Sequence, residues 1–260
     1  MLDVVQVLLG VLSGALVGFS LALVGGGGSI LAVPLMVYLV GVPQPHVAIG
    51  TSALAVAANA AVGLFNHARA EHVKWRCGLL FAVAGVAGAF AGSTAGKAFD
   101  GQKLLFLFAL VMIAVGVLML RRRATEGNGD VRLGRENAGK LGVYGLGAGA
   151  FSGFFGIGGG FLIVPGLIAA TDMAMINAVG TSLVAVTSFG LTTALNYAAS
   201  GLVDWALAGV FVAGGLIGST AGLRMAKRLS AAGQLSKAFA ALIFAVAAYM
   251  LWKSGAAAFG

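Results

Sequence analysis

The feature that most constrains this chain is a long stretch without charge near its start. No Lys, Arg, Asp or Glu lies between Asp3 and Arg69. Over the whole chain only 9% of the 260 residues are charged and 60% are hydrophobic, whereas about 25% are charged in an average soluble domain. A soluble fold of this size needs a more polar surface. The sequence therefore predicts an all-α integral membrane protein and excludes a soluble enzyme, a nucleic-acid binder and a disordered tail.

The net charge of +8 does not indicate nucleic-acid binding, because the bases form short clusters between apolar segments, as juxtamembrane charges do. Cys77 is the single cysteine, so neither an intrachain disulfide nor a cysteine-based metal site is expected. Residues 4–24 are as apolar as a signal peptide, but the preceding residues carry Asp3 and no base. We expect them to belong to the mature protein.

The chain consists of two copies of one unit. The first copy contains Gly14, Gly18, Gly25, Gly27, Gly28, Pro34, Gly50-Thr51-Ser52, Asn66, Val73 and Trp75. The second contains, in the same order, Gly145, Gly149, Gly156, Gly158, Gly159, Pro165, Gly180-Thr181-Ser182, Asn196, Val203 and Trp205. Chance does not keep such residue types in register over this length. We expect one repeat over residues 1–122, a polar linker over 123–138 and a second repeat over 139–260.

Each repeat contains five apolar segments. They are 4–24, 29–41, 46–66, 77–99 and 104–120 in the first repeat, and 141–155, 161–171, 175–197, 205–223 and 238–252 in the second. A full membrane crossing needs about 20 apolar residues. The second segment of each repeat is shorter, follows a glycine run and contains a proline, so it is expected to be a half-helix.

The distribution of bases predicts the orientation. Loop 67–76 carries three bases, whereas its counterpart 198–204 carries none. By the positive-inside rule, loop 67–76, the linker and loop 224–237 are cytoplasmic. Equivalent loops then lie on opposite sides, so the repeats are inverted and both termini are outside. Three spanning helices plus a Gly-broken helical hairpin satisfy this in each repeat; five full crossings also would, but the short second segment disfavours them.

Inverted repeats with matching broken segments are typical of secondary transporters, whose substrate sites lie near the membrane midplane. The glycine runs at 25–28 and 156–160 would leave free backbone N–H groups at the start of the next helix. Such a helix start binds anions. The alternative is that the glycines only permit tight packing. A phosphate-binding P-loop and a dinucleotide fingerprint are excluded, because no GK[ST] motif and no βαβ context accompany the runs.

The two Gly-Thr-Ser motifs offer hydroxyls that could complete the hydrogen-bond shell of an anion. Alternatively, these hydroxyls bond back to the preceding helical turn. The candidate substrate-binding residues are Gly27, Gly28, Ser29, Thr51, Ser52, Gly158, Gly159, Gly160, Thr181 and Ser182. No catalytic residue, metal or cofactor is expected. Asn66 and Asn196 are interpreted as helix-end caps, His46 as a loop residue, and the GxxxG rows as close helix packing.

These motifs resemble the duplicated signature of the TauE/SafE sulfite exporter family. The resemblance rests on Gly14-x3-Gly18-x6-Gly25-x-Gly27-Gly28-x5-Pro34, the two Gly-Thr-Ser motifs, Val73-Lys74-Trp75 and their second copies, and covers essentially the whole chain. It implies a bacterial-type inner-membrane permease for sulfur-containing anions such as sulfite, sulfoacetate or related organosulfonates. The first copy departs from the second in having Gly26 instead of Ile157 and Ser29 instead of Gly160.

The sequence thus favours a secondary transporter of sulfur-containing anions that works by alternating access and is not an enzyme. An anion channel is the first alternative. A membrane-embedded enzyme subunit is less favoured, because the spans lack acid pairs and haem-type histidine pairs. The expected partners are a small anion and the lipid bilayer, without nucleic acid, and a homodimer is left open. The sequence also leaves open which anion is moved, and in which direction.

Overall fold

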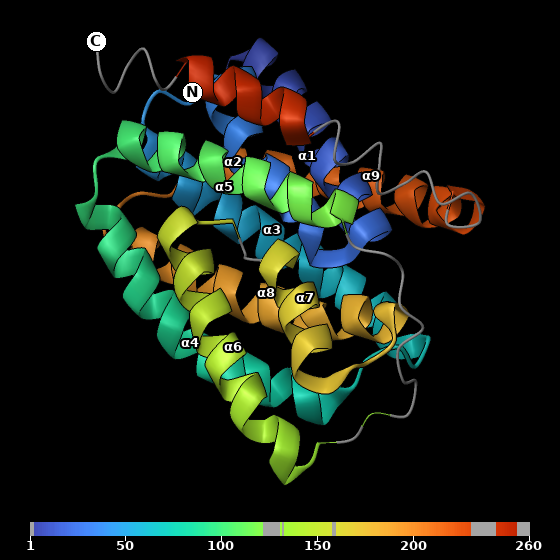
Figure 1. Ribbon diagram of the computed structural model, residues 1–260. Helices are drawn as coiled ribbons and strands as arrows, with labels where there is room; N and C mark the ends of the chain where they lie inside the picture. The colour runs from blue at the N-terminus through green and yellow to red at the C-terminus, as the bar shows by residue number, and fades with distance from the viewer. Residues whose placement is uncertain (1–2, 122–130, 132, 158–159, 230–242, 254–260) are drawn as a thin grey trace.

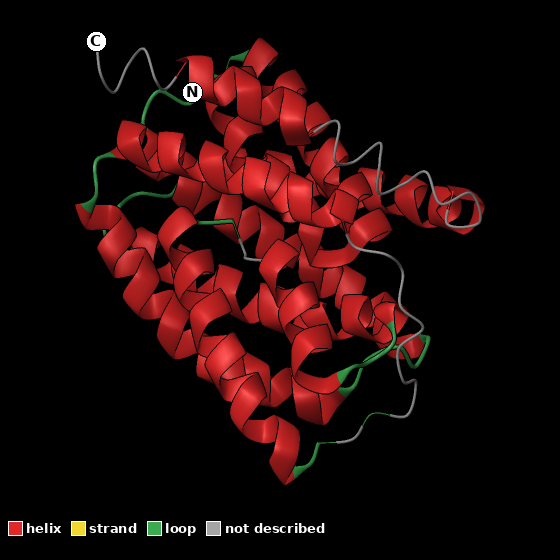
Figure 2. Ribbon diagram, in the orientation of Figure 1, coloured by secondary structure: helices red, strands yellow, loops and turns green. Residues whose placement is uncertain are grey.

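The structure is a computed structural model that describes residues 3–121, 131, 133–157, 160–229 and 243–253. In these residues all regular secondary structure is helical and no strand is present (Figure 2). The prediction of an all-α protein is therefore confirmed for the described part of the chain.

The long helices coincide with the apolar segments expected from the sequence. The first half contains α1 (Val4–Val24), η1 (Gly25–Leu31), α2 (Ala32–Pro34), η2 (Leu35–Leu39), α3 (Pro45–Arg69), α4 (Trp75–Ala98) and α5 (Gly101–Arg121). The second contains α6 (Arg135–Phe155), α7 (Gly160–Thr171), α8 (Met175–Ala198), α9 (Trp205–Leu229) and a helix over Ile243–Lys253. Among the described residues, α1, α3, α4 and α8 are long and apolar enough to cross a membrane.

The ends of these helices follow from local chemistry. Pro45 begins α3, where its missing N–H costs nothing because the first amides of a helix have no intrahelical partner. The Asp100 carboxylate accepts the backbone N–H of Lys103 at 2.9 Å and caps α5. Asp204 caps α9 in the same way, through the N–H of Leu207 at 2.9 Å. These boundaries are therefore encoded by the residues that flank each apolar segment.

Two pairs of helices lie in close parallel contact through glycines (Figure 1). In the pair α4 and α6, Gly145 lies on the carbonyl of Phe81 and Gly149 on that of Gly85. The pair α1 and α9 repeats this contact, with Gly14 on the carbonyl of Phe211 and Gly18 on that of Gly215. A Cβ at any of these glycines would overlap the partner backbone. Small residues every fourth position thus let the helix backbones touch, as the GxxxG rows predict.

The helices α3 and α8 pack together in opposite directions at the centre of the protein (Figure 1). Gly50 near the start of α3 lies against Tyr197 near the end of α8, and Gly63 lies against Leu183 near the start of α8. The ring of Tyr197 is fully buried and stacks on His46, with 6.4 Å between the ring centroids. The helix α9 packs on α3, and α4 packs on α8.

The outer faces of the helices are apolar. Leu8, Leu12 and Leu16 form an exposed stripe on α1, and Val83 on α4 is 71% exposed. A soluble protein rarely exposes contiguous apolar stripes of this kind. These faces are suited to contact with lipid.

Candidate functional site

The glycine run of the second half breaks the helix, as predicted. The helix α6 ends at Phe155, and Gly156 adopts a left-handed conformation with φ of 68°. Its N–H donates to the carbonyl of Ser152 at 2.9 Å, which closes the last turn. A Cβ at Gly156 would overlap Ile49 of α3, so both the conformation and the contact require glycine here. Gly158 and Gly159 lie outside the described residues, and Gly160 is the first residue of α7.

The glycine run of the first half forms a 3₁₀ helix, and the short helix expected after it is present as an apolar helix over Gly28–Leu39. Residues Gly25–Leu31 form the 3₁₀ helix η1, which includes Gly27, Gly28 and Ser29. Gly28 lies against the backbone of Ser20 and Leu21, so the chain folds back onto α1. A π turn, η2, follows Pro34, whose ring nitrogen has no hydrogen to donate to the preceding turn.

The two glycine-rich breaks are neighbours in space. The helix η1 packs against α7, and it also contacts α8. Ser29 of η1 is fully buried, and Gly156 lies on Ile49, the residue before the first Gly-Thr-Ser motif. The element that carries the first glycine run therefore contacts the helix that begins after the second, and Gly28 itself lies on α1.

The threonines of the two Gly-Thr-Ser motifs join the two halves. The Thr51 Oγ1 atom accepts the backbone N–H of Asp204 at 2.9 Å, and Thr181 Oγ1 accepts that of Lys74 at 2.9 Å. Both threonine side chains are fully buried. Each oxygen that accepts such a bond keeps its own O–H to donate. The threonines thus have a structural role that the sequence motifs alone do not indicate.

The serines of the motifs bond within their own helices. The Ser52 hydroxyl donates to the carbonyl of Ile49 at 3.0 Å, and the Ser182 hydroxyl donates to that of Val179 at 2.7 Å. This is bonding back to the preceding turn, which the sequence left as the alternative to anion contact. The serine hydrogens are therefore occupied in this conformation.

Asn196 connects two helices. Its amide nitrogen donates to Ser93 Oγ at 2.6 Å and to Thr94 Oγ1 at 3.0 Å, and its amide oxygen accepts from Lys97 Nζ at 2.8 Å. The residue therefore joins α8 to α4, beyond the helix-capping role expected. His46 lies in the first turn of α3, where its Nε2 atom is 3.2 Å from the carbonyl oxygen of Gly96.

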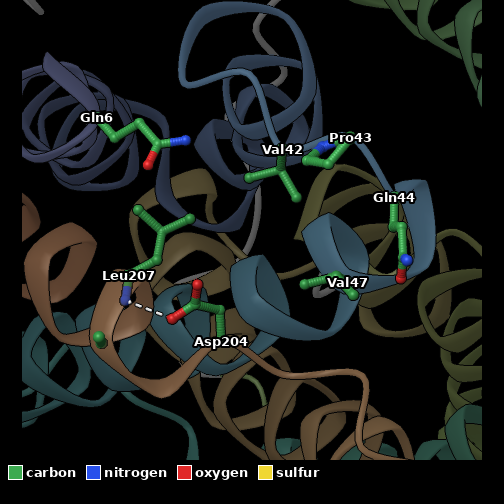
Figure 3. A pocket seen from close by; sticks show the side chains of 8 residues that line it. Gln6, Val42, Pro43, Gln44, Val47, Asp204 and Leu207 are labelled. Carbon is green, nitrogen blue, oxygen red and sulfur yellow. Dashed lines mark hydrogen bonds between the residues drawn. The ribbon is translucent and has the colours of Figure 1, made fainter. Parts of the chain in front are cut away.

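A cavity of about 440 Å³ opens where α3 and α9 begin (Figure 3). It is lined by Gln6, Val42, Pro43, Gln44, Val47, Asp204, Ala206 and Leu207. None of the candidate residues lines it, and the carboxylate of Asp204 disfavours an anion there. The backbone of Asp204 nevertheless links this cavity to Thr51.

A second, smaller cavity of about 20 Å³ lies among α1, α3, α8 and α9. Its polar lining comes from Asn59, Asn66, His67 and Ser219. Asn59 is not among the candidates that the sequence motifs predict, although its spacing from Asn66 places both on one face of a helix. Among the described residues no group of three or more His, Cys, Asp or Glu side chains is placed to hold a metal ion.

The helical fold, the apolar exterior and the polar groups between the helices define a multi-pass membrane protein. The chain belongs to the sulfite exporter TauE/SafE family, whose sequence model matches residues 10–250. It is therefore a membrane transporter of this family.

Relatives across nearly the whole chain agree with this assignment. A protein of Xylella fastidiosa (strain 9a5c), named "Probable membrane transporter protein", is 53% identical over 246 residues, which cover 94% of each chain. "Probable membrane transporter protein YunE" of Bacillus subtilis (strain 168) is 29% identical over 247 residues, which cover 87% of this chain and 89% of YunE. These names indicate transporters rather than enzymes. No solved structure matches this chain.

Proposed function

We propose that this protein is a secondary transporter that moves sulfur-containing anions, such as sulfite or organosulfonates, across the cytoplasmic membrane by alternating access. The observation that carries the proposal is the packing of η1 against α7. The helix η1 carries the first glycine run and α7 follows the second, so this contact supports one shared site for two breaks that lie far apart in the sequence. Backbone amides at these breaks form the proposed anion site, whereas Thr51 and Thr181 lie towards opposite ends of the antiparallel pair α3 and α8.

The choice of backbone donors follows from the lack of charged ones. The segments α1, η1, α7 and α8 contain no Lys or Arg. An anion without compensating donors is costly to bury, and the amide ends of short helices supply partial positive charge without a buried cation. The glycine-run candidates for this site are Gly27, Gly28 and Ser29 from the first repeat and Gly158, Gly159 and Gly160 from the second, while Ser52 and Ser182 donate their hydroxyls within α3 and α8.

Alternating access in this proposal uses two inverted repeats, residues 1–122 and 139–260, joined by a cytoplasmic linker over 123–138. Support comes from contacts between the halves that occur twice, each time between equivalent residues of the two repeats. Gly149 on the carbonyl of Gly85 has its counterpart in Gly18 on the carbonyl of Gly215. The equivalent helices α3 and α8 also run antiparallel, which is the relation that inversion requires. Both termini then lie outside.

The test is anion flux in proteoliposomes containing the purified full-length protein. Radiolabelled sulfite is the first probe, with sulfoacetate, taurine and chloride compared beside it. We expect saturable uptake of the sulfur-containing anions and counterflow against a trapped pool. Uptake that does not saturate, without counterflow, would identify a channel instead.

Glycine variants test where the anion binds. Gly159→Ala is expected to abolish sulfite counterflow while inserted protein is still recovered, because a Cβ blocks approach to the amides. Gly28→Ala is expected to disturb the packing of η1 on α1 as well, because a Cβ there would overlap the backbone of Ser20 and Leu21. Gly147→Ala is the control for adding a Cβ, since a Cβ there meets nothing within 4 Å. Wild-type counterflow in Gly159→Ala would reject the amide site.

A further inference from the structure

The middle of α3 carries a buried polar side chain without a partner. Asn59 is 4% exposed, and neither its amide oxygen nor its amide nitrogen has a hydrogen-bond partner among the described residues. Leaving both groups unpaired in the interior is unfavourable, because each lost its bonds to water on burial. Because burying this unpaired amide costs free energy, we look for a functional role for Asn59.

The repeat shows that an amide is not needed at this position for packing. Asn59 lies against Gly215 of α9, and the equivalent residue of the second repeat, Phe189, lies against Gly85 of α4. Phe189 fills its place with an aromatic ring, which stacks on Phe81 at 6.3 Å between ring centroids. The same glycine-lined position thus accepts an apolar side chain in one half and carries an unpaired amide in the other.

The unpaired amide lines the smaller cavity. From Asn59 the cavity wall follows one face of α3 through Gly63, Asn66 and His67 towards the end of that helix. Gly63 and Asn66 follow at spacings of four and three, and His67 lies four residues after Gly63, so these residues share that face. The Nδ1 atom of His67 is likewise without a partner among the described residues. Polar side chains therefore continue along this face of α3 from its middle towards its end.

We infer that Asn59 contacts the transported anion and donates its amide N–H to an oxygen of a small oxoanion. This inference rests on the proposed function and extends its site from the glycine breaks to α3. An amide suits this task because it offers a donor without placing a charge in the membrane interior. The cavity of about 20 Å³ admits a water-sized group, so an oxoanion that contacts Asn59 must widen it.

The first experiment compares two substitutions, each of which removes a buried polar group that has no hydrogen-bond partner among the described residues. Asn59→Leu removes the amide, and the matched control Thr193→Val removes a fully buried hydroxyl that also has no partner among the described residues and lies outside both cavities. With sulfite as the probe in proteoliposomes, Asn59→Leu is expected to raise KM at least tenfold or abolish flux. Thr193→Val is expected to stay within twofold of the wild type.

Melting temperature separates a binding role from a structural one. Neither variant is expected to melt below the wild type, because each replaces an unpaired polar group with an apolar one. Unchanged sulfite flux in Asn59→Leu beside a transporting wild type overturns this inference alone. A wild type that moves none of the probe anions overturns the proposed function, and this inference with it.

A second experiment covers the case in which Asn59→Leu does not fold. Cys77 is the single cysteine of the chain, so Cys77→Ser provides a background for Asn59→Cys and Thr193→Cys. A charged, membrane-impermeant thiol reagent applied to opened membrane vesicles is expected to label Asn59→Cys and not Thr193→Cys. Absence of labelling at position 59, with Ala70→Cys labelled in parallel, overturns the inference.

Discussion

At the scale of single residues, the threonines show how a sequence motif acquires a role through a distant partner. The sequence predicts Thr51 and Thr181 as anion ligands because their hydroxyls belong to a Gly-Thr-Ser motif that recurs in both repeats. In the structure each also accepts a backbone N–H from the opposite half, from Asp204 and Lys74 respectively. Each bond holds the start of α9 or α4 against the other repeat.

The first prediction concerns the stability that these bonds provide. Thr51→Val or Thr181→Val removes the acceptor while keeping the side-chain volume, and is expected to lower the free energy of unfolding by about 1 kcal/mol. Thr51→Ser is the control, because it retains the oxygen. Thermal melting in detergent is the measurement. A melting temperature equal to that of the wild type in both valine variants would contradict the bridging role.

The second prediction uses the same variants for anion binding. If the threonine O–H groups donate to the anion, valine should also weaken sulfite binding, by about 1–3 kcal/mol for the lost polar contact. Isothermal titration or the KM of transport measures this. Wild-type affinity in both variants would leave Thr51 and Thr181 with the bridging role only.

At the scale of the helices, the positions of the glycines determine which helices pack in close contact. The contacts of α6 with α4 and of α1 with α9 depend on backbone touching backbone, which any side chain prevents. Other glycines of α6 face away: a Cβ at Gly142 or Gly147 would meet nothing within 4 Å. The number of glycines in a helix therefore does not identify its contact face, whereas a spacing of four residues between glycines does.

The third prediction tests this difference on one helix. Gly149→Ala places a Cβ on the carbonyl of Gly85 and is expected to destabilise the protein by about 1–3 kcal/mol, as overpacking does. Gly147→Ala, two residues away, is expected to change stability by less than about 0.5 kcal/mol. Melting temperature and the yield of monodisperse protein are the measurements. Equal effects at the two positions would argue against the packing of α6 on α4.

At the scale of the whole molecule, the antiparallel packing of α3 and α8 bears on membrane orientation. Ala70 follows α3 and Ala199 follows α8, and both residues are exposed. Because the two helices run in opposite directions, these residues lie at opposite ends of the pair. This geometry agrees with the difference in charge between loops 67–76 and 198–204.

The fourth prediction follows from that arrangement. In a Cys77→Ser background, Ala70→Cys is expected to react with an impermeant thiol reagent only from the cytoplasmic side, and Ala199→Cys only from the outside. Intact cells and inverted membrane vesicles provide the two sides. Reaction of both cysteines from the same side would reject the inverted repeats.

The sequence by itself determined the elements, because what specifies them is local. Apolar length predicts the long helices, a proline marks the start of α3, and the glycine at position 156 ends α6. Register between the halves, including the paired Gly-Thr-Ser motifs, is likewise visible without a structure. The family resemblance rests on these same local motifs.

Only the tertiary structure decided what those motifs contact. The bond from Asp204 to Thr51 joins residues far apart in the sequence, and the unpaired amide of Asn59 is defined by what surrounds it on α1 and α9. The first glycine run forms a 3₁₀ helix folded onto α1, with Gly28 against the backbone of Ser20 and Leu21. Hydrogen-bond partners depend on the packing of whole helices, and the GxxxG rows predict a contact face on each helix but not which helix packs on it.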